Sequence, residues 1–101
     1  MSNNAGLVRR QATAFVEAIS NLSPKEREQN PSAQYADRFN QVLALAKEAE
    51  PGLDPRLWPN PVAHRQLEDG STVAGARYVE FETYARQIMG NFKKGVLTGM
   101  D

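Results

Sequence analysis

The chain has 101 residues, which is enough for one domain with a single modest hydrophobic core. Twelve basic and twelve acidic residues give a net charge of zero, so no overall attraction to nucleic acid or to an anionic membrane follows. Cysteine is absent, which excludes disulfides, thiolate chemistry and the commonest soft ligands of zinc. We therefore expect a single domain, residues 1–101, that needs no metal ion and no cofactor.

The N-terminus carries no basic segment followed by an apolar stretch of signal-peptide length. The longest apolar runs are short pieces such as residues 42–46, whereas a membrane-spanning helix needs about 20 residues. The sequence therefore predicts a cytoplasmic protein that does not enter a membrane.

The first predicted element is a helix over residues 5–22, because its apolar residues recur at steps of four and three and so share one face. These residues are Val8, Ala12, Phe15, Ile19 and Leu22. Ser23, Pro24 and Glu26 then have the spacing of a capping box, which begins a brief helix. Pro31 ends that helix, since the residue before a proline is pushed away from helical angles.

A second long helix is predicted over residues 32–48, where Leu43 and Leu45 widen an apolar stripe. The stripe itself consists of Tyr35, Phe39, Val42 and Ala46. The pair Pro51–Gly52 ends the helix, and Asp54–Pro55 then predicts a single helical turn.

Residues 62–76 allow two interpretations. Asp69–Gly70 is a favoured hairpin turn that would pair residues 62–67 with residues 71–76, but Ser71 or Thr72 could equally cap the next helix. The last helix is predicted over residues 78–92, although its first seven residues also alternate as a strand would. The helical interpretation is favoured because a stripe with three- and four-residue steps continues to the end; it consists of Tyr78, Phe81, Ala85, Ile88 and Phe92.

These elements predict an all-α fold, a small three-helix bundle with short extra turns and a frayed tail at residues 95–101. The alternative is an α+β fold with a β-hairpin within residues 62–84.

Function is less constrained than fold. Because no metal-ligand cluster or catalytic constellation is evident, we expect a non-enzymatic helical module that binds another protein or forms a homo-oligomer. Its partner-binding residues would be exposed aromatic and apolar side chains, since these dominate binding energy at interfaces. The candidates are Leu57, Trp58, Tyr78, Tyr84 and Phe92. For Trp58 a place in the protein's own core is the competing interpretation.

A second hypothesis is a weak nucleic-acid-associated regulator, which requires the first and last helices to lie side by side and join their basic residues into one face. These residues are Arg9, Arg10, Arg86, Lys93 and Lys94. A third hypothesis is a small enzyme or ligand-binding protein around His64, with Asp69 and Ser71 as its neighbours. Glu80 and Glu82 are expected to be solvated carboxylates in the first turn of the last helix.

Overall fold

The computed structural model describes the backbone of residues 4–100 and the side chains of residues 5–92. Its elements in chain order are α1 (Asn4–Ser20), α2 (Pro24–Arg27), α3 (Ala33–Ala49), the 3-10 helix η1 (Pro55–Leu57), β1 (His64–Gln66), β2 (Thr72–Ala74) and α4 (Tyr78–Met100). The described chain is thus mostly helical, with one two-stranded antiparallel sheet.

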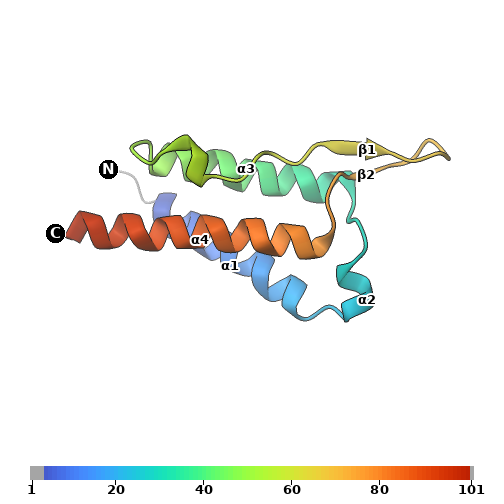
Figure 1. The fold of residues 1–101 in the computed structure, drawn as a ribbon, viewed down its shortest axis with the longest axis horizontal. Helices are drawn as coiled ribbons and strands as arrows, with labels where there is room; N and C mark the ends of the chain where they lie inside the picture. The colour runs from blue at the N-terminus through green and yellow to red at the C-terminus, as the bar shows by residue number, and fades with distance from the viewer. Residues whose placement is uncertain (1–3, 101) are drawn as a thin grey trace.

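The three long helices lie lengthwise beside one another (Figure 1). The hairpin β1–β2 projects beyond the helices at one end of the molecule, which is also the end that carries α2, and both chain ends point the opposite way. The molecule is elongated as a result, with extents of 52 × 24 × 21 Å.

The core is continuous and aromatic at its centre. The ring of Phe39 lies edge-on to those of Phe15 and Phe81, with ring centres 5.8 and 5.3 Å apart. Most residues of the three predicted stripes are buried, which confirms the helical periodicity; these are Val8, Ala12, Phe15, Ile19, Phe39, Val42, Ala46, Phe81, Ala85, Ile88 and Phe92.

The helix starts follow the side-chain chemistry that the sequence predicts. Ser23 Oγ accepts a hydrogen bond from the Glu26 amide at 3.2 Å, and Glu26 Oε1 accepts one from the Ser23 amide at 3.0 Å. This reciprocal pair is the predicted capping box of α2. Ser32 caps α3 through the Tyr35 amide, and Asp54 caps η1 through the Arg56 amide.

The sheet departs from the all-α prediction and agrees with the hairpin alternative within residues 62–84. Antiparallel pairing joins His64 with Ala74 and Gln66 with Thr72. Gly70 has φ of 90°, a conformation that glycine adopts without steric cost, and so permits the tight turn. The alternating stretch from Tyr78 onward is helical, as the length of its apolar stripe predicted.

Backbone contacts fix the hairpin to the helical body. The Ala74 amide donates to the carbonyl of Pro31, just before α3, at 2.8 Å, while the Gly75 amide closes the base of the hairpin itself by donating to the Ala63 carbonyl at 2.7 Å. Asn40 on α3 bonds both backbone groups of Val62, at 2.9 and 2.8 Å. The chain between α3 and the hairpin is therefore held along the side of α3, where it covers part of the core.

Helix α4 extends to Met100, and the frayed tail expected over residues 95–101 stays a prediction. The side chains of residues 93–100 and the whole of Asp101 lie outside what the structure describes. Within the described part of the chain, no helix is long and apolar enough to cross a membrane.

Candidate functional site

An open groove runs between α1 and α3 on the surface of the helical body. It has a volume of about 400 Å³. Its lining combines residues of α1 and α3, which are Gln11, Ala14, Phe15, Ala18, Tyr35, Arg38, Gln41, Val42 and Leu45. The lining residues from Tyr35 to Leu45 extend over about 15 Å of α3 at 1.5 Å per residue, or nearly three turns of helix.

The floor of the groove is apolar because it is the outer edge of the core. Phe15 and Val42 are buried to 8% and 6% exposure, and Leu45 beside them is half-buried. Ala14 and Ala18 form the α1 wall and are exposed, so only a methyl group separates the backbone of α1 from the solvent. Small residues of this kind allow another element to approach closely.

Tyr35 lies at one end of the groove among aromatic rings. Its ring contacts those of Phe15 and Tyr78 edge-on, with centres 5.2 and 5.3 Å apart. Its hydroxyl is buried and has no hydrogen-bond partner among the described residues. Burial, with a smaller contribution from Tyr78, raises the pKa of Tyr35 to about 12, so the phenol remains neutral under ordinary conditions.

The rim of the groove on α3 is polar. Arg38 and Gln41 are exposed, and Arg38 forms no ion pair with any residue that the structure describes. Arg38 is the one charged residue in the lining. The groove therefore combines an apolar floor with a basic rim, an arrangement typical of surfaces that accept an amphipathic partner.

The five residues predicted to bind a partner do not form one exposed surface. Trp58 and Phe92 lie in the core, at 7% and 0% exposure, with ring centres 6.1 Å apart. Tyr78 and Tyr84 are half-buried against other aromatic rings. Leu57 is exposed, and its carbonyl accepts hydrogen bonds from Gln87 and Asn91 on α4.

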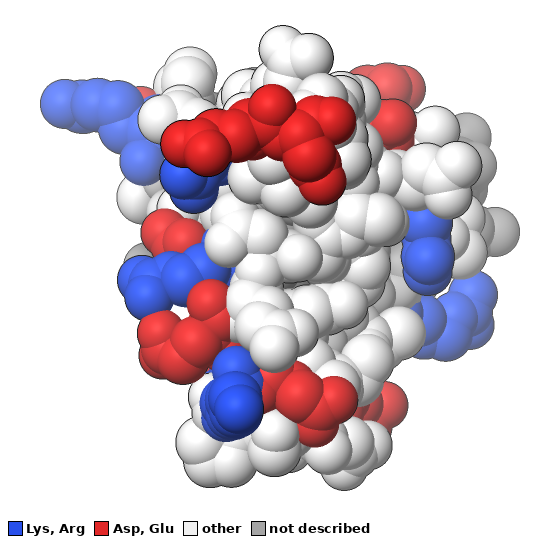
Figure 2. Space-filling view, turned by 90° about the vertical axis from the view of Figure 1, so that its right-hand side faces the viewer, with Lys and Arg blue, Asp and Glu red and all other residues white. Residues whose placement is uncertain are grey.

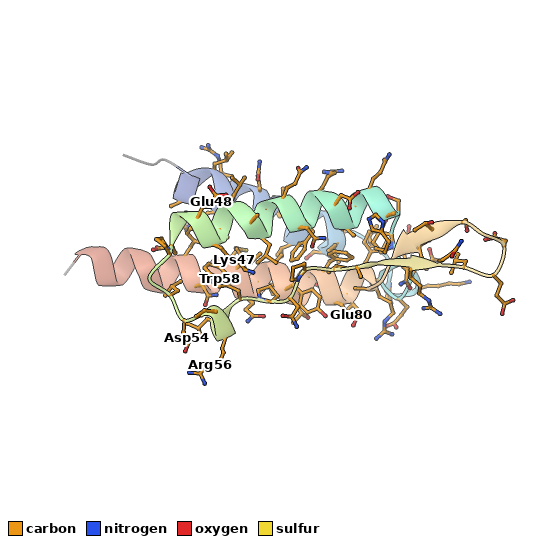
Figure 3. The ribbon with its side chains drawn as sticks, turned by 90° about the horizontal axis from the view of Figure 1, so that it is seen from above. Lys47, Glu48, Asp54, Arg56, Trp58 and Glu80 are labelled. Carbon is orange, nitrogen blue, oxygen red and sulfur yellow. The ribbon has the colours of Figure 1, made fainter. Side chains whose placement is uncertain are left out.

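Trp58 serves the fold in this arrangement. It lies between the helices, whereas the nearby Asp54 and Arg56 point away from the body (Figure 3). With Trp58 and Phe92 enclosed, a partner could reach them only by opening the core.

The basic residues of the nucleic-acid hypothesis are only partly brought together. Helices α1 and α4 do lie side by side, since Thr13 Oγ1 is 3.8 Å from Met89 Sδ. Arg9 and Arg10 are exposed on α1, but Arg86 is paired with Glu82 at 2.9 Å. The side chains of Lys93 and Lys94 lie outside the described residues.

At the end of the molecule that carries α2 and the hairpin, charged side chains of both signs are mixed. On its left-hand side, basic and acidic side chains lie next to one another, beside a wide uncharged band (Figure 2). This end of the molecule thus presents no extended basic surface for a phosphate backbone.

The structure gives His64 a partner different from the predicted ones. Its Nε2 lies 2.7 Å from Asp37 Oδ1 on α3, and both side chains are about half exposed. Asp69 instead accepts from the Ser71 hydroxyl at 2.6 Å within the hairpin turn. The structure records no hydrogen bond from His64 to Asp69 or Ser71, so it does not join the three residues as a catalytic relay would require.

Glu82 corrects another sequence expectation. It was predicted to be solvated, but it is buried at 8% exposure and accepts hydrogen bonds from Arg27 on α2, Arg86 on α4 and Ser20 on α1. The hydrogen bond from Arg86, helped by the charge of Arg27, holds its pKa below the ordinary value of 4.5. This group ties three helices together and lies away from the groove.

Metal binding has no support in the part of the chain that the structure describes, where no group of three or more potential ligands occurs. Comparisons with protein-family models, with curated proteins and with solved structures found no match to this chain. The functional interpretation therefore depends on the geometry of the described residues alone.

Proposed function

We propose that this protein is a non-enzymatic helical interaction module, and that its partner-binding surface is the face formed by α1 and α3. We call this surface the α1/α3 face. The observation that carries the proposal is the open groove between these helices, with Phe15 and Val42 in its floor. A partner would gain most from covering the apolar side chains that remain accessible along the groove, those of Ala14, Ala18 and Leu45, because area removed from water supplies the main driving force of association.

The neighbouring faces are already used by the chain itself. Gln87 and Asn91 on α4 bond the carbonyl of Leu57, so the segment after η1 lies along α4. Asn40 on α3 binds the same segment near Val62. The α1/α3 face has no such covering segment among the described residues, and this supports its assignment to a partner.

A helical partner fits the shape of the face. The groove follows nearly three turns of α3 and about two turns of α1, and Ala14 and Ala18 allow close approach along one wall. Recognition of this kind places the apolar stripe of an incoming helix against the groove and leaves its polar side in solvent. The half-buried Gln11 and the exposed Arg38 and Gln41 would then contact the partner at the rim.

Site-specific photocrosslinking tests the proposal in cells that make the protein naturally. A benzophenone side chain replaces Gln41 at the rim of the groove, or Ala44 on another exposed part of the same helix as a control. We expect a discrete adduct from position 41 and none from position 44. Equal adducts from both positions, or none from position 41, would contradict the proposed surface.

A further inference from the structure

We infer that the partner on the α1/α3 face is a second copy of this chain, bound so that the two α3 helices run antiparallel. The inference depends on the proposed function, because it names the molecule that covers the same face. Its basis is a row of four exposed polar residues and Leu45, which packs at the edge of the core, on the outer side of α3; we call this row the α3 stripe. The α3 stripe consists of Gln34, Arg38, Gln41, Leu45 and Glu48.

The α3 stripe has the spacing of a helix–helix contact. Its residues recur at alternating steps of four and three, the repeat that keeps side chains of one helix facing a neighbouring helix. Four of them are exposed, and Leu45 is half-buried beside the groove. The stripe is separate from the core-facing row of α3, which contains Phe39, Leu43 and Ala46. Helix α3 therefore has a second row whose four polar residues lie outside the core of its own chain.

The charges of the α3 stripe lie symmetrically about its centre. Arg38 and Glu48 are five residues before and five residues after position 43. In an antiparallel pair centred there, Arg38 of each copy lies level with Glu48 of the other, and Gln41 lies level with Leu45. In a parallel pair, Arg38 would meet Arg38 and Glu48 would meet Glu48, so like charges would repel. Charge complementarity thus selects the antiparallel arrangement.

A surface that binds itself through a two-fold axis must carry each group and its complement on the same face. The α3 stripe meets this condition with one cation and one anion, and neither forms an ion pair with any described residue. The two apolar grooves would face each other across the axis. Burial of Leu45 and of the exposed Ala14 and Ala18 would supply affinity, and the two ion pairs would fix the orientation.

Analytical ultracentrifugation of the full chain gives the first test. We expect a reversible dimer whose fraction rises with protein concentration. A protein that stays monomeric up to its solubility limit overturns the inference.

Two charge reversals give the decisive test. Arg38→Glu places carboxylates opposite Glu48, and Glu48→Arg places guanidinium groups opposite Arg38, so each variant should self-associate about tenfold more weakly or worse. When the two variants are mixed, both cross-pairs become attractive, and a heterodimer should form with an affinity near that of the original protein. Recovery in the mixture also shows that both variants are folded.

Lys47→Glu is the matched control, because Lys47 is an exposed cation of α3 on the side towards Trp58, whereas Glu48 lies on another side of the helix (Figure 3). It should leave the dimer unchanged. A mixture of Arg38→Glu and Glu48→Arg that stays monomeric, or a Lys47→Glu effect as large as theirs, overturns the inference.

The outcomes separate this inference from the proposed function. A monomeric protein whose position 41 still crosslinks to a different protein, with no adduct from position 44, keeps the α1/α3 face as a partner surface and rejects the second copy. If the protein forms a dimer whose affinity neither charge reversal changes, and position 41 gives no adduct, both the proposed surface and the antiparallel dimer are wrong.

Discussion

The ion-pair cluster at Glu82 permits a quantitative prediction. Replacing Glu82 with Gln keeps the shape of the side chain and removes its charge. The carboxylate bonds Arg27 and Arg86, whose side chains are 33% and 61% exposed. A hydrogen bond to a charged group contributes about 1.5–3 kcal/mol when buried, and an exposed ion pair less than about 1 kcal/mol.

The bond from Arg27 should contribute an amount between these two limits, and the bond from the more exposed Arg86 an amount near the lower one. The Glu82→Gln variant should therefore lose about 2 kcal/mol of unfolding free energy. For a chain of this length, that loss lowers the midpoint of thermal unfolding by about 10 °C. Circular dichroism at 222 nm, recorded at neutral pH on heating, measures the shift.

The pH dependence of stability tests the role of Glu82 independently. Because the pKa of Glu82 is lowered in the folded protein, its contribution is complete above the ordinary value of 4.5 and is lost as the pH falls through the lowered pKa. The difference in stability between the original protein and Glu82→Gln should therefore shrink on acidification.

Glu28→Gln is the matched control, since Glu28 also bonds an arginine, Arg77, at 2.7 Å but is 61% exposed. We expect it to cost less than about 1 kcal/mol. If Glu82→Gln destabilises the fold no more than Glu28→Gln does, the structural role assigned to Glu82 is wrong.

Two further predictions concern the core and the backbone. Tyr35→Phe removes a buried hydroxyl that has no described hydrogen-bond partner. The unfolding free energy of this variant, measured by urea unfolding, should equal that of the original protein or exceed it by up to about 1 kcal/mol. A loss of more than about 1 kcal/mol would show that the hydroxyl forms a hydrogen bond. Gly75→Ala places a Cβ 2.7 Å from the Ala63 carbonyl oxygen and should cost about 1–3 kcal/mol, whereas Gly90→Ala, in open space on α4, should gain about 0.5–1 kcal/mol. Equal effects of these two glycine substitutions in thermal unfolding would contradict the close approach at Gly75.

The long helices were predictable because their signal is local. Steps of three and four between apolar residues, from Val8 to Ile19 and from Phe81 to Phe92, are sufficient to identify the buried face of a helix. The capping box at Ser23 and Glu26 was predictable for the same reason, since all its hydrogen bonds lie within four residues.

The hairpin could not be decided from the sequence because its stability comes from distant residues. Residues 69 and 70 allow a turn, but a hairpin this short is marginal alone. Asn30 and Pro31, more than 40 residues earlier in the chain, bond the backbone of Ala74 and hold β2 in place. A capped helix start at Ser71 could be excluded only by knowing these contacts.

The site was less predictable than the fold for a related reason. Aromatic type suggested Trp58 and Phe92 as partner-binding residues, yet type alone does not distinguish a core residue from an interface residue. Glu82 and Arg86 have the four-residue spacing of a helical ion pair, which the sequence displays, but the third member, Arg27, comes from a helix 55 residues away.

Helix α3 carries two rows of side chains, an apolar row that determines the fold and a polar row that can determine how a partner is oriented. The row with Phe39 and Leu43 is recognised by its hydrophobicity, and its burial stabilises the fold. Hydrophobic burial has no direction, so it is equally favourable whether a neighbouring helix runs parallel or antiparallel. The row with Arg38 and Glu48 contributes little to the stability of the single chain, since both residues are exposed. Its order of charges can nevertheless distinguish antiparallel from parallel pairing, which apolar burial alone cannot do. We therefore expect Arg38 and Glu48, which form no ion pair with any described residue, to determine which partner α3 binds and in which orientation.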